Sequence, residues 1–352
     1  MKRQLARICW PNMTQTIHGL WCRVLSLGIL LSLPLVGISP VCGQEESDDV
    51  AMAAYADAAN FQTGGAIRLA IDGWQSFLSK HPKHPMAADA SHFLGVCYMQ
   101  QETPDYVAAA KAFGNALQKP KYDLREESLA NFGWCNYIAS GDGDQRDQAK
   151  LKLALESFQR LLKESPKTHF MDRALFFSGE AAYGMGDSNL AVRYYDRMLA
   201  MPDAKDSLLR CDALYARGVA YEELEQLDKA LNSFKQLLGS CDRTELVTDV
   251  HLRMGDMMIM RKDYDAAVQS FANAMKSTEL ADDRAYALFR QAFAHVQANA
   301  PAKAAEKYER LLTEYPNSAY TGSAILASAQ STYRSGDIDA AAKRFEKVLQ
   351  QN

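Results

Sequence analysis

The chain has 352 residues, with 39 lysines and arginines against 43 aspartates and glutamates, and a formal net charge of −4. A weakly acidic chain lacks the basic surface that binds a phosphate backbone, which argues against nucleic acid as a partner. A chain of this length usually folds into two globular domains, unless it is an array of repeats.

Residues 1–43 have the composition of a secretory signal peptide. The segment carries four basic residues and no acidic one, and its apolar run extends from Val24 to Ile38. This run is shorter than the roughly 20 residues that span a bilayer, and Pro34 interrupts it. We therefore predict export, with cleavage near Gly43 and Gln44. Cleavage would leave the mature chain more acidic, with a net charge near −8.

Two details of this segment leave alternatives open. Met13 precedes the apolar run, so it is an alternative start to Met1. Cys42 is a candidate for a lipid anchor, but the residues from Ser39 to Val41 fit the lipoprotein pattern poorly. They lack its leucine and its small residue directly before the cysteine. We expect no lipid anchor at Cys42.

The rest of the chain repeats one pattern, an alanine followed four residues later by an aromatic residue. The eight pairs are Ala70/Trp74, Ala109/Phe113, Ala154/Phe158, Ala191/Tyr195, Ala230/Phe234, Ala267/Phe271, Ala304/Tyr308 and Ala341/Phe345. Successive alanines are 37 to 45 residues apart. A fixed period of this length is typical of repeat architectures. We therefore predict one array of repeats in place of two domains.

Each period combines two amphipathic helices with a short polar turn. Asp187, Asp263 and Asp337 lie in these turns, where an aspartate caps the free N–H groups of the second helix. We predict an all-α fold of about eight helix-turn-helix repeats after the signal peptide and a polar linker at 44–49. The approximate repeats are 50–82, 86–120, 124–166, 170–202, 207–241, 244–276, 281–316 and 318–352.

A small residue stands twelve positions before each of the last five alanines: Gly179, Gly218, Gly255, Ala292 and Ala329, with Gly95 and Gly133 in the same place upstream. A glycine within a helix costs about 1 kcal/mol relative to alanine, so we expect it where helices approach closely. The helices of a repeat should cross at the small residue of the first and the alanine of the second. The second-helix alanines of the later repeats are Ala191, Ala230, Ala267, Ala304 and Ala341. The aromatic residue should then fill the space between one repeat and the next.

The small residue, the Ala-x3-aromatic pair and a closing proline resemble the tetratricopeptide repeat (TPR) family over residues 50–352. This resemblance implies a right-handed superhelical solenoid that acts as a non-enzymatic, protein-binding scaffold. The linker segments 77–100 and 311–337 look most like those of envelope members. Among these are the lipoprotein of the outer-membrane assembly machinery and the periplasmic coordinator of the Tol-Pal system. The resemblance therefore implies a location in the periplasm or cell envelope, and a role in assembling or coordinating envelope complexes.

Catalytic and metal-binding signatures are missing from the sequence. It contains no H-E-x-x-H, G-x-S-x-G or Walker motif, and no C-x-x-C pair. His81 and His84 lie in a turn between repeats, where we expect them to be solvated and not to bind a metal. We predict no catalytic residue, no metal and no cofactor.

Cys211 and Cys241 stand at the two ends of one predicted hairpin, whose turn lies near Glu225. The ends of an antiparallel hairpin lie close together, and an exported protein meets an oxidising environment. We predict a disulfide between them. Cys97 and Cys135 occupy equivalent places in successive repeats, and we expect both to be small core residues.

We expect partner binding on the concave face, which the first helices line. Aromatic residues at positions predicted to face it are Trp134, Tyr137, Phe176, Tyr183, Tyr215, Phe289 and Phe293; the last repeat carries Leu326, Gln330 and Tyr333 there. TPRs that capture a C-terminal carboxylate resemble one another in carrying Lys and Asn at two of these kinds of position, and this chain has neither there. A mostly apolar face suits an extended peptide or an amphipathic helix. The alternative is that many of these aromatics pack between helices.

The last predicted helix, 339–350, presents Phe345, Val348 and Leu349 without a polar capping helix after it. Repeat arrays normally end in such a cap. We therefore expect a partner or a second copy of the chain to cover this end. A structural or oligomerising spacer without a peptide ligand is the alternative to the scaffold function.

Overall fold

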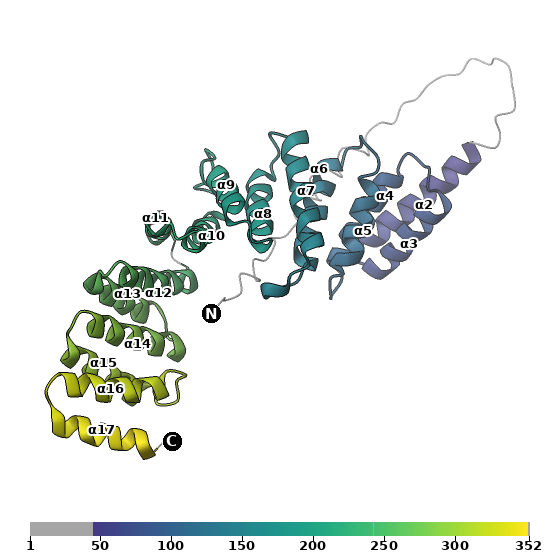
Figure 1. Ribbon diagram of the computed structural model, residues 1–352. Helices are drawn as coiled ribbons and strands as arrows, with labels where there is room; N and C mark the ends of the chain where they lie inside the picture. Colours follow the sequence, from purple (N-terminus) through teal and green to yellow (C-terminus); the bar gives the residue numbers. More distant parts are fainter. Residues whose placement is uncertain (1–44, 242, 351–352) are drawn as a thin grey trace, which may run out of the picture. The chain divides into compact units, whose positions relative to one another are not determined.

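The computed structural model describes residues 45–241 and 243–350 as a series of α-helices (Figure 1). Sixteen α-helices and one short 3₁₀ helix make up the secondary structure of these residues, and no strand occurs among them. The predicted all-α fold is thus confirmed. None of the described helices is long and apolar enough to span a bilayer. The predicted signal peptide lies outside the described residues.

The helices form two units, which follow one another in sequence at Gly186 and Asp187. The first contains α2 (Glu45–Thr63), α3 (Ile67–Lys80), α4 (Ala87–Gln100), α5 (Tyr106–Ala116), α6 (Arg125–Ala139), η3 (Gly143–Gln145), α7 (Gln148–Glu164) and α8 (Met171–Gly184). The second contains α9 (Ser188–Leu199), α10 (Arg210–Glu223), α11 (Leu227–Leu238), α12 (Thr244–Met260), α13 (Tyr264–Ser277), α14 (Ala281–Gln297), α15 (Pro301–Glu314), α16 (Thr321–Arg334) and α17 (Ile338–Gln350). Consecutive helices within each unit pack against one another.

The predicted polar linker is corrected by the structure, because residues 45–49 form the start of α2. Asp48 and Asp49 lie near the start of α2, and negative charge is favourable at the positive end of a helix dipole. Ala51 and Ala58 then bury α2 against the following helices. Acidic composition at a helix start was thus mistaken for a linker.

The glycines of the first helices lie beneath aromatic rings of the second helices. A Cβ on Gly218 would lie 2.3 Å from the Phe234 ring, and one on Gly255 would lie 2.5 Å from Phe271. Gly95 and Gly133 stand in the same relation to Phe113 and Phe158, at 2.8 and 2.7 Å. Each ring therefore fills the space inside its own hairpin. The rings also reach the next repeat, as predicted, since Trp74 stacks on Phe93 and Phe271 contacts Tyr286.

The alanines of the repeat pattern are buried as well. Ala191, Ala230, Ala267, Ala304 and Ala341 are at most 1% exposed, and Ala292 and Ala329 are fully buried at the small position of their first helices. Gly179 is also buried. At these positions a larger side chain has no space, because core packing is as dense as in a molecular crystal.

The turns between the helices of a repeat have one recurring geometry. Asp187, Asp263 and Asp337 each accept a hydrogen bond from the backbone N–H three residues later, so the predicted caps are confirmed. The residue before each cap has a positive φ, 81° at Gly186 and 92° at Gly336. When the residue after a helix is left-handed, the backbone N–H groups there can donate to the last carbonyl oxygens of the helix. Glycine adopts this conformation without steric cost.

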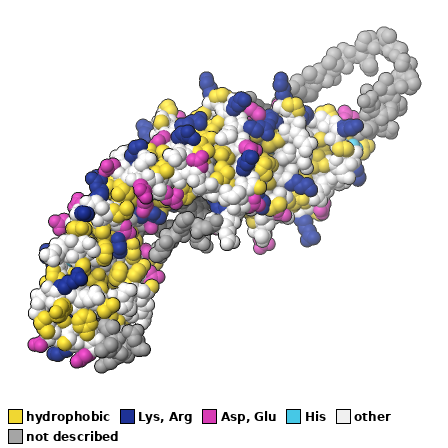
Figure 2. Space-filling model, viewed as in Figure 1, with side chains coloured by type: hydrophobic (Ala, Val, Ile, Leu, Met, Phe, Trp, Pro, Cys, Tyr) yellow, Lys and Arg dark blue, Asp and Glu magenta, His cyan; other side chains and the backbone are white. Residues whose placement is uncertain are grey.

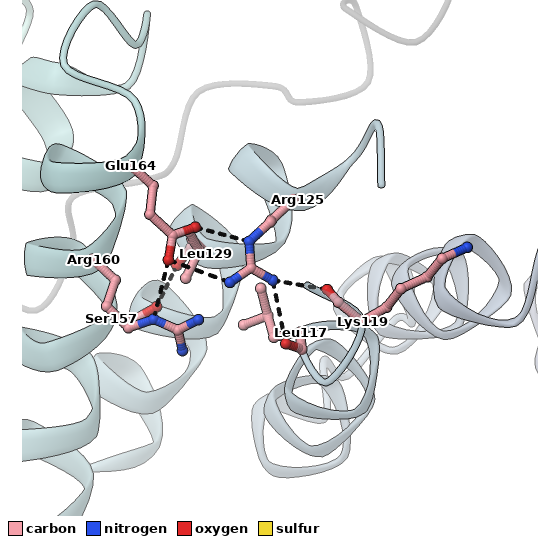
Figure 3. A network of polar contacts seen from close by, with 7 residues as sticks. All are labelled: Leu117, Lys119, Arg125, Leu129, Ser157, Arg160 and Glu164. Carbon is pink, nitrogen blue, oxygen red and sulfur yellow. Dashed lines mark hydrogen bonds and ion pairs between the residues drawn. The ribbon is translucent and has the colours of Figure 1, made fainter. Parts of the chain in front are cut away.

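Arg125, the first residue of α6, connects three helices of the first unit (Figure 3). Its guanidinium donates to the carbonyl oxygen of Lys119 at 2.9 Å, beyond the end of α5, and to the Glu164 carboxylate at 2.8 Å, at the end of α7. The hydrogen bond from Arg125 lowers the pKa of Glu164, and Arg160 adds to this effect. Carbonyl groups at helix ends need such donors. This contact fastens the α4/α5 hairpin to the α6/α7 hairpin.

The glycine–aromatic contact predicts opposite effects for two glycine-to-alanine substitutions in the second unit. Gly255→Ala should destabilise by about 1–3 kcal/mol, because its methyl group collides with the buried Phe271 ring. Gly322→Ala, where no atom lies within 4 Å of the new methyl group, should stabilise by up to ~1 kcal/mol. Urea unfolding midpoints measure both effects. Equal midpoints for the two variants would contradict this packing.

Candidate functional site

Three of the seven aromatic residues expected on the binding face lie in the interior. Trp134, Phe176 and Tyr215 are 4%, 0% and 6% exposed. The Trp134 and Phe176 rings contact Phe177, with centroid distances of 4.7 and 5.0 Å. Their assignment as partner contacts is therefore corrected. Phe177 on α8 covers Trp134 on α6, and Asp249 on α12 accepts a hydrogen bond from Tyr215 on α10.

The other four residues, Tyr137, Tyr183, Phe289 and Phe293, are half-buried. In the first unit, Tyr137 donates to Glu180 at 3.1 Å, and the Arg146 guanidinium lies 4.2 Å from its ring centroid. Burial raises the pKa of Tyr137. The phenol is thus a neutral donor, held in place by contacts within the protein.

A network of polar side chains joins α10 to α12 in the second unit. Tyr215 donates to Asp249 at 2.5 Å, and Arg253 Nε donates to the same carboxylate at 2.7 Å. Arg253 also donates to Glu222 on α10 at 2.8 Å. Burial, and then the charge of Asp249, raise the pKa of Tyr215. The Arg253 guanidinium thereby links Asp249, Glu222 and, through Asp249, Tyr215 across α10 and α12.

A second network of the same kind joins α12 to α14. Tyr286 and Arg290 on α14 both donate to Asp256 on α12, each at 2.6 Å. The Arg290 guanidinium lies 5.1 Å from the Phe293 ring centroid, within the range of a cation–π contact. The first-helix surface here is therefore built from paired charges. The sequence predicts a mostly apolar face, and the ion pairs of Arg253 and Arg290 correct that prediction.

Arg253 and Arg290 were missed because they lie just outside the positions assigned to the binding face. Each stands two residues before the small residue of its helix, Gly255 or Ala292. A signal was present, because Arg253 follows Asp249 by four residues and such pairs share one face of a helix. The pairing of Arg253 with Glu222, and of Arg290 with Asp256, on the preceding first helix could be seen only in the structure.

The first helix of the last repeat, α16, carries the most accessible apolar side chains at the predicted positions. Leu326 is 43% exposed and Tyr333 is 58% exposed, and Gln330 between them is exposed too. Phe289 and Phe293 hold the corresponding positions on α14, and Phe289 stacks on Tyr320 at a centroid distance of 5.4 Å. We define the first-helix face of the second unit as Phe289 and Phe293 on α14, Leu326, Gln330 and Tyr333 on α16, and the two polar networks.

His92 and Ser128 in the first unit are the described residues whose pairing most resembles a catalytic one, and both are buried. His92 Nδ1 lies 2.7 Å from Ser128 Oγ, but His92 is only 5% exposed and Ser128 is fully buried. Burial lowers the pKa of His92 to about 3, so the imidazole is neutral. A pair enclosed by the Phe93 and Phe113 rings is out of reach of a substrate. Among the described residues, no group of three or more His, Cys, Asp or Glu is arranged to hold a metal ion.

The structure joins Cys211 and Cys241 by a disulfide across the base of the α10/α11 hairpin. A second link lies beside it, because Arg243 donates to the buried Asp212 carboxylate at 2.7 Å. Cys97 and Cys135 are free and buried, and burial raises the pKa of Cys97 to about 12. A buried thiol with a high pKa is unreactive.

These features describe an all-α protein of stacked helical hairpins. Residues 178–243 match a tetratricopeptide repeat model, and residues 276–352 match a model of a tetratricopeptide repeat-like domain. These two segments are tetratricopeptide repeats, and domains of this kind generally mediate protein–protein interactions. A comparison with curated proteins finds no match. Charged side chains of both signs lie beside hydrophobic ones on the surface in view in Figure 2.

Three solved structures align with this chain, and the first of them, with a TM-score above 0.5, shows the same fold. The C-terminal part of a TPR repeat-containing protein from Cytophaga hutchinsonii aligns with a TM-score of 0.57 and 15% identity, over 78% of this chain and 98% of that chain. A tetratricopeptide repeat protein from Parabacteroides merdae aligns with a TM-score of 0.46 and 15% identity, over 82% and 99%. PilF of Pseudomonas aeruginosa aligns with a TM-score of 0.44 and 18% identity, over 65% and 92%.

Removing the disulfide should weaken the second unit. Its cysteines are 30 residues apart, and the chain-entropy estimate for such a loop gives a loss of about 3–4 kcal/mol in the double variant Cys211→Ser/Cys241→Ser. Reductant should lower the melting temperature of the wild type and leave that of the double variant unchanged. Thiol titration of the denatured, unreduced protein that starts at Gln44, and so lacks Cys9, Cys22 and Cys42, should find the two thiols of Cys97 and Cys135. Four thiols would contradict the pairing.

His92 should make stability depend on pH. Between its unfolded pKa of about 6.5 and its folded pKa of about 3, the unfolded chain binds a proton that the folded chain does not. The free energy of unfolding should therefore fall by about 1.4 kcal/mol for each pH unit of acidification in this range. His92→Gln should lower the slope by this amount, measured by urea unfolding from pH 6.5 to 4.5, and leave the part due to His251 and His295, whose pKa values burial also lowers. His81→Gln should keep the full slope. An unchanged slope in His92→Gln would refute the assignment.

Proposed function

We propose that the protein is an exported, non-enzymatic scaffold that binds segments of other proteins on the first-helix face of the second unit. The observation that carries this proposal is the exposure of Leu326 and Tyr333 at the binding positions of α16. Apolar side chains exposed seven residues apart on one helix lie on the same side of it. Neither side chain is needed to fill the core, so both are available to a partner.

The polar networks beside these residues support binding without rearrangement. Arg253 and Arg290 are 22% and 24% exposed and are already held by carboxylates of neighbouring helices. Side chains fixed before binding lose little conformational entropy when a partner arrives. The first-helix face therefore offers a preformed surface, apolar on α14 and α16 and paired in charge between α10 and α14.

The chemistry of this face favours an extended peptide or an amphipathic helix as the ligand. Phe289, Phe293, Leu326 and Tyr333 supply apolar contacts, and Gln330 supplies an amide that can pair with a peptide backbone. The Lys and Asn pair of carboxylate-capturing TPRs is missing from the corresponding sequence positions. Contacts along a segment, and not capture of a chain end, are thus the proposed mode.

Two features support export to the periplasm or cell envelope. The sequence of residues 1–43 has the order of a secretory signal peptide. The disulfide between Cys211 and Cys241 suits an oxidising compartment, because structural disulfides are rare in reducing ones. Assembly or coordination of envelope complexes is the proposed role there.

Self-association through the last hairpin is a further part of the proposal. Phe345 on α17 is half-buried, and the side chains of Val348 and Leu349 lie outside the described ones. A second copy of the chain bound there would make the protein a spacer as well as a scaffold.

Affinity purification from the native envelope, read by quantitative mass spectrometry, tests the scaffold function. The double variant Leu326→Ser/Tyr333→Ser should reduce recovery of specific partners about tenfold or more, because it removes central apolar contacts. Leu280→Ser is the matched control, since Leu280 is 57% exposed in the segment before α14 and lies outside this face. Circular dichroism should show that both variants are folded. Unchanged recovery in the double variant would favour a spacer without a ligand on this face.

A further inference from the structure

The first-helix face of the second unit carries more acidic than basic side chains. Its two polar networks contain three carboxylates, those of Glu222, Asp249 and Asp256, against the two guanidiniums of Arg253 and Arg290. The three carboxylates are partly exposed, and hydrogen bonds from tyrosine or arginine side chains hold each of them in place. One negative charge of the two networks is therefore not balanced within them.

Two oxygen atoms of these carboxylates remain free to accept hydrogen bonds from a partner. Tyr215 and Arg253 both donate to Oδ2 of Asp249, and no described residue donates to its Oδ1. Arg253 also donates to Oε2 of Glu222, whose Oε1 accepts no hydrogen bond within the described part of the chain. Because both carboxylates bind the same guanidinium, they occupy one small region between α10 and α12. An ammonium or guanidinium there would donate charge-assisted hydrogen bonds to them.

The end of the face at α16 has an excess of acid as well. The exposed Arg334 follows Tyr333, and the exposed Asp337 and Asp339 come directly after it, in the turn and at the start of α17. Tyr333 is 58% exposed, and among the described residues no ring or cation contacts its ring. The electron-rich face of such a ring attracts a lysine or arginine side chain.

Apolar side chains lie between these two acidic regions. The helix α14 contributes the half-buried Phe289 and Phe293, and α16 contributes the exposed Leu326. A segment that crosses the face from α10 to α16 therefore meets carboxylates first, then apolar side chains, and then an exposed aromatic ring beside further carboxylates.

We propose that the ligand of this face is a cationic amphipathic segment of a protein, with lysine or arginine side chains beside apolar ones. This inference rests on the proposed scaffold function and adds the chemistry of the partner. One cationic side chain binds the free oxygens of Glu222 and Asp249, and apolar side chains cover Leu326 and the phenylalanines. The net charge of the chain, −4, acts in the same direction, because it favours the approach of a cationic segment.

Three synthetic amphipathic peptides test the charge preference. They share their leucine positions and carry lysine, glutamine or glutamate at every polar position. Fluorescence anisotropy with the full chain should show that the lysine peptide binds about tenfold or more tightly than the glutamate peptide, with the glutamine peptide between them. Added salt should remove most of this difference, because it screens exposed charges. Leu326→Ser/Tyr333→Ser should weaken the binding of all three peptides, since they share the apolar contacts.

Glu222→Gln tests where the cation binds. This variant should bind the lysine peptide about two- to fivefold more weakly and the glutamine peptide as the wild type does, because it removes one partly exposed charge. Glu314→Gln is the matched control, since Glu314 on α15 also accepts from an arginine, Arg310 at 2.6 Å, and lies outside this face. Circular dichroism should show that both variants are folded.

The outcomes separate the charge preference from the scaffold function. Equal binding of the three peptides, lost in Leu326→Ser/Tyr333→Ser, would overturn the cationic preference and leave the scaffold function standing. Tightest binding of the glutamate peptide, no binding of the lysine peptide at about 1 mM, or equal losses in Glu222→Gln and Glu314→Gln would also overturn the inference. Unchanged binding of all three peptides in Leu326→Ser/Tyr333→Ser would show that the proposed binding face itself is wrong.

Discussion

The contact between a glycine of one helix and an aromatic ring of the next sets the geometry of the hairpins. Where Phe234 and Phe271 lie above Gly218 and Gly255, even a methyl group on the glycine would overlap the ring. The glycine lowers the helix propensity, but the ring that it admits stabilises the hairpin by more, because the ring is buried between the two helices. Because this contact fixes how closely the two helices approach, it also fixes which side of the first helix remains outside.

The polar contacts on the outward side of the first helices join successive repeats. Tyr215 and Asp249 are 34 residues apart in sequence, close to one repeat period, and meet because α10 and α12 hold equivalent places. Asp256 and Tyr286 meet in the same way between α12 and α14. Partly buried ion pairs of this kind contribute more to geometry than to stability, since desolvation offsets much of their attraction. A surface with fixed charges is the consequence.

The parts of the structure that the sequence predicted are those determined by local periodicity. The all-α fold and the caps at Asp187, Asp263 and Asp337 depend on residues within a few turns of one another. Exposure on the first helices depends on the neighbouring hairpin, which periodicity does not describe. Trp134 and Tyr333 are both at positions predicted to face a partner, yet Phe177 covers Trp134 and Tyr333 stays 58% exposed.

A stacked-repeat architecture keeps the stability of each hairpin local. Each hairpin packs mainly on its sequence neighbours, so the stability of an array is close to a sum of local terms. The core around Trp74 and Phe77 supports α3 and α4, and a separate core around Tyr308 and Leu311 supports α14 and α16. A ligand that binds one hairpin would stabilise that hairpin and its neighbours by mass action and leave distant hairpins unaffected. A substitution on the surface of one hairpin should therefore change that surface without disturbing the cores of distant hairpins.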